Sequence, residues 1–256
     1  MNAPLLRLEA LSWGVGGQML GRGFDLTIEA GQIVALMGPN GCGKTSLLRT
    51  MLGLIPPLDG RIELDARPLD AWGHRERAAH VGYVAQHSPA APGYPTLDWV
   101  LLARTARLGI GQAPGERDRS AALEALRTVG IADLARRAID ALSGGERQLA
   151  AIARALAQGS RLLLLDEPSA SLDFGNRARV DACLRALAAT GRAVVLTTHD
   201  PAQAAALADR VALLERGGAP QIGTAVRMLE PQRLARVFGV APALIRAAQP
   251  VASAGA

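Results

Sequence analysis

The sequence predicts an α/β fold, in which the strands of a parallel sheet alternate with helices. Short, uninterrupted apolar runs end in polar residues at IVALM (33–37), RLLLLDEP (161–168) and RAVVLTTHD (192–200). Such runs are typical of parallel strands that are buried on both faces. A helical pattern at 175–189 separates the last two runs, as a strand-helix-strand unit requires.

The first quarter of the chain predicts antiparallel strands. Residues 5–36 carry apolar stretches that the glycine cluster 14–17 divides, and 56–65 return to a turn and a strand. Between them, the leucines of TSLLRTMLGL (45–54) have helical spacing, and Gly53 ends the helix. We therefore expect an N-terminal antiparallel β subdomain.

The middle of the chain predicts helices, from about 97 to 158. Further on, 202–209 indicate a short helix, RVALLE (210–215) a strand and LEPQRLARVFGV (229–240) a last helix. These patterns suggest one domain with an inserted α-helical subdomain. The expected layout is a domain at 5–240, its core at 5–87 and 159–225, its helical subdomain at 88–158, and a tail at 241–256.

Composition excludes several classes of protein. With 49% apolar and 20% charged residues, the chain is expected to fold as a globular protein, with no leader peptide and no apolar run long enough for a spanning helix. Cys42 and Cys183 lack metal-ligand spacing and are expected to be reduced thiols. The net charge of +5 comes from scattered arginines, which we interpret as solvated surface rather than a nucleic-acid site.

The stretch GPNGCGKT (38–45) holds the only lysine of the chain, Lys44. It matches G-x-x-x-x-G-K-[ST] between a strand and a helix, where backbone N–H groups cradle phosphates. A compact ammonium on a thin stem suits such a loop better than the wide arginine fork. The pattern predicts ATP and Mg²⁺ as ligands, and the expected nucleotide-binding residues are Gly38, Pro39, Asn40, Gly41, Cys42, Gly43, Lys44, Thr45 and Ser46.

Two more strand ends are expected at the same edge of the sheet, because ligands bind outside the carboxyl ends of parallel strands. Asp166 is expected to hold Mg²⁺ together with Thr45. Glu167 is placed to deprotonate the attacking water, and His199 to contact the γ-phosphate. None of these residues would indicate an active site by itself. The prediction rests on their shared position at the carboxyl ends of strands.

Six motifs in order resemble those of ATP-binding cassette (ABC) ATPases over roughly residues 5–240. They are GPNGCGKT, VGYVAQ ending at Gln86, LSGGE from Leu142, LLLLDE, ASLD ending at Asp173, and TTHD. The resemblance implies a RecA-like P-loop NTPase core and ATP hydrolysis. It also implies that Gln86 contacts Mg²⁺ or the attacking water.

The resemblance further implies a head-to-tail homodimer that sandwiches two ATP molecules. In it, Ser143, Gly144 and Gly145 bind the γ-phosphate held by the partner copy, and Asp173 crosses the interface. Ser143 and Glu146 also form a capping-box pattern, and a helix N-terminus of this kind attracts anions.

One position departs from the family pattern. The family usually stacks an aromatic ring on adenine where this chain has Val15. Trp13 either belongs to the core or takes over that contact. Base stacking contributes roughly 1–3 kcal/mol per base in nucleic-acid complexes, so we expect weaker ATP binding or looser base selectivity.

Three further stretches resemble the ATPases of iron-siderophore, haem and cobalamin importers: YPTLDWVLLARTARLG, SLDFGNRARV and LARVFGV. Some relatives of those importers carry molybdate or tungstate. Only part of the V-x-M-G-R pattern of these ATPases is kept, as VLLAR. The resemblance implies a peripheral ATPase on the cytoplasmic face of the inner membrane. Its partners would be a transmembrane permease, docked near 88–105, and indirectly an extracytoplasmic binding protein, with no nucleic acid.

Two alternatives remain at this point. An exporter ATPase fits the shared motifs equally well, although LARVFGV and DFGN favour an importer. A soluble cassette protein that acts on nucleic acid or ribosomes would fit the basic charge. Such proteins usually carry inserted coiled coils, zinc modules or a second cassette, and this sequence has none of them.

Overall fold

The computed structural model describes residues 4–86, 92–108 and 112–248. The predicted α/β fold is confirmed. Its centre is a six-stranded sheet in the order β10-β9-β3-β8-β7-β6, in which β9 and β10 pair antiparallel and the other neighbours are parallel. The strands are β3 (Ile33–Met37), β6 (Val81–Val84), β7 (Leu162–Leu165), β8 (Ala193–Thr198), β9 (Arg210–Leu213) and β10 (Gln221–Thr224).

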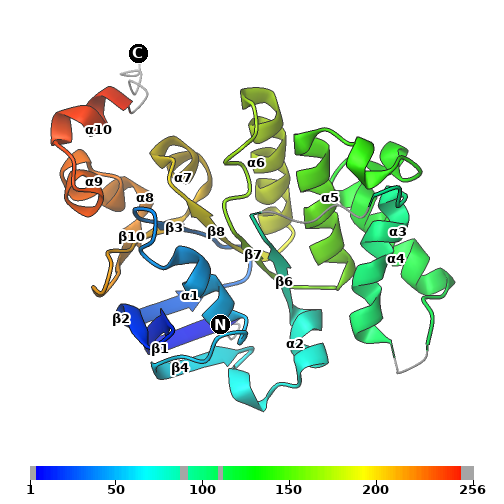
Figure 1. Cartoon of the computed structure of the whole chain (residues 1–256), viewed down its shortest axis with the longest axis horizontal. Coiled ribbons are helices and arrows are strands. Elements are labelled where there is room, and N and C mark those ends of the chain that lie inside the picture. The colour runs from blue at the N-terminus through cyan, green and yellow to red at the C-terminus, as the bar shows by residue number, and fades with distance from the viewer. Residues whose placement is uncertain (1–3, 87–91, 109–111, 249–256) are drawn as a thin grey trace.

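The expected antiparallel strands form a second sheet, in the order β2-β1-β4-β5. They are β1 (Leu6–Val15), β2 (Gln18–Ile28), β4 (Asp59–Leu64) and β5 (Arg67–Pro68), at the lower left of Figure 1. A core cluster joins this sheet to one face of the parallel sheet, through residues such as Leu8 and Trp13 on one side and Leu36 and Val195 on the other. The first helix, α1 (Lys44–Met51), packs into the same cluster through Leu47 and Leu48.

Helices cover the opposite face of the parallel sheet and extend to the right in Figure 1. Alternate strand residues such as Ile33, Val194 and Leu196 belong to this second cluster. The helices are α3 (Thr96–Leu101), η2 (Leu102–Arg107), α4 (Glu116–Thr128), η3 (Ala132–Leu134), η4 (Ile139–Ala141), α5 (Gly144–Ala157) and α6 (Phe174–Ala189).

The helix expected from 97 onward is shorter than predicted, because α3 gives way to the 3-10 helix η2. Two arginines of η2 form hydrogen bonds with the carboxyl end of α5. Arg104 Nη1 donates to the carbonyl of Ala157 at 2.9 Å, and Arg107 Nε donates to the carbonyl of Gln158 at 2.5 Å. The tight bonds to a neighbouring helix therefore outweigh the intrinsic helical pattern. Residues 88–91, at the start of the expected helical subdomain, lie outside the described residues.

The remaining helices flank the central sheet: η1 (Leu69–Ala71), α2 (His74–His80), α7 (Pro201–Leu207), α8 (Ala225–Met228), α9 (Pro231–Phe238) and α10 (Pro242–Ala248). Neither α2 nor α10 was predicted. The first part of the stretch expected as a tail is thus helical, and 249–256 lie outside the described residues. Within the described part of the chain, no helix combines the length and apolar character that crossing a membrane requires.

Candidate active site

The glycine-rich loop joins the end of β3 to the start of α1, and its glycines are required by the backbone. Gly41 and Gly43 have φ values of 76° and 100°, in the left-handed region that side chains disfavour. A Cβ atom at Gly43 would also lie 2.8 Å from the Cβ of Leu20 and 2.9 Å from the indole nitrogen of Trp13. The loop can therefore keep this shape only without side chains at these positions.

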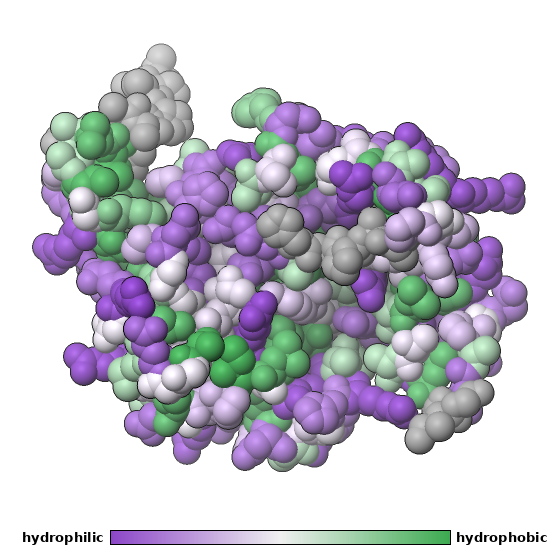
Figure 2. Space-filling model, in the orientation of Figure 1, coloured by the Kyte–Doolittle hydropathy of each residue, from purple (hydrophilic) through white to green (hydrophobic). Residues whose placement is uncertain are grey.

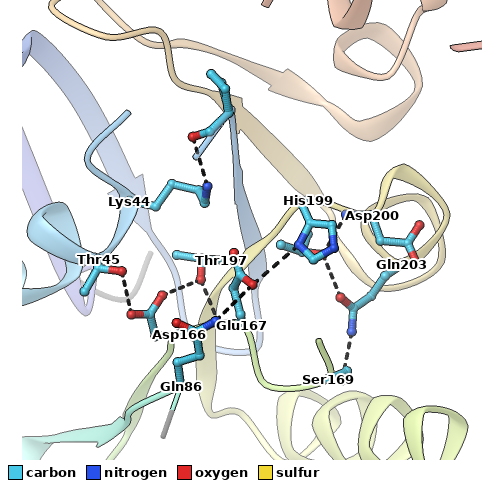
Figure 3. A network of polar contacts seen from close by, with 12 residues as sticks. Lys44, Thr45, Gln86, Asp166, Glu167, Ser169, Thr197, His199, Asp200 and Gln203 are labelled. Atoms are coloured by element: carbon cyan, nitrogen blue, oxygen red, sulfur yellow. Dashed lines mark hydrogen bonds and ion pairs between the residues drawn. The ribbon is translucent and has the colours of Figure 1, made fainter. Parts of the chain in front are cut away.

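Lys44 lies inside this loop, as Figure 3 shows. Its Nζ donates to the carbonyl of Gly38 at 2.8 Å and to that of Pro39 at 3.3 Å, and the residue is only 6% exposed. Cys42 is also buried, so only its backbone faces a ligand. Burial raises the pKa of the Cys42 thiol, which keeps it neutral.

Asp166 follows β7 and is fixed by two threonine hydroxyl groups. Thr45 Oγ1 donates to Asp166 Oδ2 and Thr197 Oγ1 donates to Asp166 Oδ1, both at 2.7 Å. Thr197 Oγ1 also accepts the backbone N–H of Glu167 at 2.7 Å. The end of β8 thus orients both acidic residues, and sequence reasoning missed this role of Thr197.

Glu167 lies between the other two predicted catalytic residues. Its Oε2 is 3.4 Å from Nε2 of Gln86, at the end of β6, and 3.4 Å from Nδ1 of His199, after β8. The Glu167 side chain is 14% exposed and that of His199 55%. Glu167 also has a φ of 47°, and a non-glycine residue in this region is typical of functional sites.

These groups open onto one cleft of about 830 Å³. Its described lining includes the predicted residues Gly38, Pro39, Asn40, Gly41, Gly43, Lys44, Thr45, Ser46, Gln86, Glu167 and His199, together with Val15, Leu20 and Phe238. Asp166 lies behind Thr45 and is 3% exposed. Sequence reasoning missed Leu20 and Phe238, because nothing in a lone apolar residue separates a cleft wall from a core.

Val15 is 52% exposed on the wall of this cleft, whereas Trp13 is 1% exposed. The indole nitrogen of Trp13 donates to the backbone carbonyl of Gly43 at 3.1 Å. Trp13 is therefore a buried residue that packs under the phosphate loop and binds its backbone, and its ring is not available for stacking on a base.

The other predicted nucleotide contacts do not line this cleft. Ser143 caps α5 as expected, because Ser143 Oγ accepts from Glu146 N at 3.3 Å and Ser143 N donates to Glu146 Oε2 at 2.7 Å. These hydrogen bonds hold the pKa of Glu146 below its usual value. Asp173 caps α6 by accepting from Asn176 N at 2.8 Å, and a Cβ at Gly145 would meet Asn176. The two helix N-termini thus lie side by side, away from the phosphate loop.

Thr45 and Asp166 fit a magnesium site in which phosphate oxygens supply part of the coordination shell. Mg²⁺ is usually held by one or two carboxylates together with substrate phosphates, rather than by an all-protein cage. Thr45 and Asp166 supply a hydroxyl and a carboxylate at the loop that would hold the phosphates. The described residues include no cluster of three His, Cys, Asp or Glu side chains that would form such a cage.

The sequence pattern of the family described as "ABC transporter" matches residues 22–170, more than half of the chain. The chain belongs to this family. It is an ATP-binding ATPase of the ABC transporter type, as the order of motifs predicted.

Relatives of the whole cassette are similar to this ABC ATPase. An "Uncharacterized ABC transporter ATP-binding protein" of Haemophilus influenzae is 40% identical over 94% of this chain and 92% of the relative. A "Hemin import ATP-binding protein HmuV" of Myxococcus xanthus is 39% identical over 89% of this chain and 87% of the relative.

Solved structures have the same fold. A putative metal-chelate type ABC transporter in an inward-facing conformation superposes with a TM-score of 0.82 at 32% identity, covering 92% of this chain and 89% of that chain. The cbiO1 protein of Clostridium perfringens superposes with a TM-score of 0.80 at 24% identity, covering 92% of this chain and 94% of that chain.

Proposed function

We propose that this ABC ATPase powers the uptake of an iron complex, such as a siderophore or haem, or of a related metal chelate such as cobalamin, through a separate membrane permease. The names of two similar proteins support the substrate class: hemin import for the Myxococcus xanthus relative and metal-chelate transport for the solved structure. The ATPase would act as a peripheral subunit on the cytoplasmic face of the inner membrane. An extracytoplasmic binding protein would deliver the cargo.

One cleft carries the hydrolytic role, because it is lined by Lys44, Thr45, Glu167 and His199. Asp166 is buried and accepts the hydroxyl of Thr45 at the edge of this cleft. Lys44 would exchange its loop carbonyls for phosphate oxygens. Bound Mg²⁺ would neutralise charge on the phosphates, and Asp166 with Thr45 would hold it, with Gln86 near the metal or the water.

Glu167 would accept a proton from the attacking water, a contribution of typically 10²–10⁴-fold in rate. His199 would hold the γ-phosphate beside it. Glu167→Gln keeps the shape of the side chain but removes the base. We expect this variant to bind ATP and to lose turnover, and unchanged turnover would show that Glu167 is not the base.

A head-to-tail homodimer would complete the site. Ser143–Gly145 and Asp173 lie together at the starts of α5 and α6, but outside the cleft that holds the phosphate loop of the same chain. A helix N-terminus with exposed N–H groups attracts anions, so a second copy could offer these groups to the γ-phosphate. The arrangement would place two ATP molecules between two copies.

The permease would dock in a second cleft of about 470 Å³, between the core and the helical part. Ala85 and Trp99 line it, near the expected docking segment 88–105, of which 88–91 lie outside the described residues. Arg77, Arg154 and His74 also line the cleft, and its described lining has no carboxylate. An apolar permease helix that bears an acidic residue would suit this lining. Figure 2 shows hydrophobic surface between α1 and α2 beside it.

Gentle solubilisation of membranes tests this proposal. The tagged ATPase should co-purify with a many-spanning permease, whose identity would narrow the cargo. Leu54→Arg, at a 64% exposed residue that lines the docking cleft, should abolish this association and leave ATP hydrolysis by the free chain unchanged. Val226→Arg, at an 85% exposed residue elsewhere, is the matched control. Recovery only with RNA, DNA or ribosomes would overturn the transport role.

A further inference from the structure

A buried glutamine in α7 joins three parts of the chain around the catalytic residues. Gln203 is 6% exposed, and its amide makes three hydrogen bonds. Oε1 accepts from Thr198 Oγ1 at 2.8 Å, while Nε2 donates to Ser169 Oγ at 3.1 Å and to Asp181 Oδ1 at 2.8 Å. Both donor hydrogens and one acceptor position are therefore in use.

The partners of Gln203 are close in sequence to the catalytic pair. Thr198 immediately precedes His199, and its hydroxyl also accepts the backbone N–H of Asp200 at 3.1 Å. Ser169 is two positions after Glu167, and Asp181 belongs to the interior of α6. Figure 3 shows Gln203 beside His199, with its amide pointing toward Ser169. One side chain thus ties the backbone around His199 to the backbone after Glu167.

His199 depends on this backbone for its position. Its side chain is 55% exposed, so few neighbours restrict its rotation, and its contact with Glu167 is 3.4 Å long. A second bond supports the same loop, from Arg177 Nη1 in α6 to Asp200 Oδ2 at 2.5 Å. Both donor hydrogens of the Gln203 amide are used, and buried groups whose hydrogen bonds are satisfied rigidify the segments that they join.

We propose that Gln203 is a positioning residue for ATP hydrolysis, which sets the distance between His199 and Glu167 through Thr198 and Ser169. The proposal rests on the proposed roles of Glu167 and His199. Gln203 does not line the nucleotide cleft, so it acts on turnover and not on ATP binding. Misplacement of catalytic groups by about 1 Å can cost up to a hundredfold in rate.

Gln203→Leu tests the proposal, since it keeps the bulk of the side chain and removes all three hydrogen bonds. We expect kcat to fall at least about tenfold, and the Kd for ATP, measured by equilibrium dialysis without Mg²⁺, to change by less than about twofold. Unchanged kcat would overturn the proposal. So would a Kd that rises as much as kcat falls, because that is the signature of general structural damage.

A paired exchange gives a readout that loss of stability does not reproduce. Gln203→Glu would place two carboxylates together, and kcat should fall as it does in Gln203→Leu. Adding Asp181→Asn to this variant restores the hydrogen bond in the reverse direction, because the new amide at position 181 can donate to the new carboxylate at position 203. The pair then carries one negative charge, as it does in the unmodified protein. The double variant should recover kcat to within about threefold of the unmodified protein, and failure to recover would contradict the proposal.

Ser160→Ala is the matched control. Ser160 is 2% exposed and its hydroxyl donates to the Ala155 carbonyl at 2.8 Å, before the start of β7 and away from the cleft. This variant should lose stability and keep kcat. Unchanged kcat in Glu167→Gln and His199→Ala would instead overturn the proposed catalytic roles, so the two failures are distinguishable.

Discussion

The hydroxyl of Thr45 donates to the carboxylate of Asp166 at 2.7 Å, although the two residues are 121 positions apart in the chain. The bond joins the first turn of α1 to the end of β7. It brings a phosphate-loop hydroxyl and a strand-end carboxylate to one point, as a magnesium site completed by phosphates requires.

Exchanges at Thr45 test this magnesium site. Thr45→Ser keeps the hydroxyl and should preserve magnesium-dependent hydrolysis within about threefold, whereas Thr45→Ala should lower it at least about tenfold. ATP binding without Mg²⁺ should change little in either variant. Titration of hydrolysis rate against Mg²⁺ concentration measures the effect, and equal magnesium dependence of the two variants would contradict the assignment.

Lys44→Arg should abolish ATP binding or turnover, even though it keeps the positive charge. The loop encloses the lysine ammonium at 2.8 Å from the Gly38 carbonyl, and the wider guanidinium does not fit that space. The matched exchange in the opposite direction is Arg49→Lys, at an exposed position of the same helix, and it should leave hydrolysis unchanged. An arginine variant at position 44 with the original ATPase rate would contradict this account of the only lysine.

Stability should depend on pH through Glu146. Its pKa is lowered from the usual 4.5, first by the hydrogen bond from the backbone N–H of Ser143. A lowered pKa means that the carboxylate stabilises the folded state above the unfolded pKa, and that this contribution is lost as pH falls through the folded pKa. Glu146→Gln should therefore lower the free energy of unfolding at pH 7, and the difference from the original protein should shrink as the pH falls below the usual pKa of 4.5. Urea unfolding across this range measures it, and a constant difference would contradict the prediction.

Val15→Tyr should strengthen ATP binding at least about fivefold, because an aromatic ring on the cleft wall can stack on the base. Val15 is 52% exposed there, which leaves room for a larger side chain. The original protein should bind ATP, GTP and CTP with similar affinity, and the variant should favour the purine nucleotides. Strong preference for ATP in the original protein would mean that another residue recognises the base.

Residues with a motif were predictable from the sequence. The glycine loop, Asp166, Glu167 and His199 follow apolar runs, and the parallel order β3-β8-β7 brings those strand ends together. The capping box at Ser143 was predictable for the same reason, because its partners are three residues apart and local geometry decides the contact.

Residues whose role depends on tertiary packing were not predictable. Thr197 and Gln203 have partners 31 and 34 positions away in Asp166 and Ser169, and no local pattern marks a threonine or glutamine that will be buried. Helix α2 is short and mostly polar, so its sequence lacks the apolar period that indicates a helix. The hydrogen bond of 2.8 Å between Arg77 and His74 can form only after the helix has formed.

A mixture of two inactive variants tests whether two copies of the chain share each ATP site. Lys44→Arg disables the phosphate loop. Gly144→Asp places a negative charge at the start of α5, where the helix tolerates it and a phosphate would be repelled. An exchanged equimolar mixture should regain about a quarter of the original ATPase activity, since half of the dimers are mixed and each has one intact site. A mixture no more active than its separate components would contradict a site shared between copies.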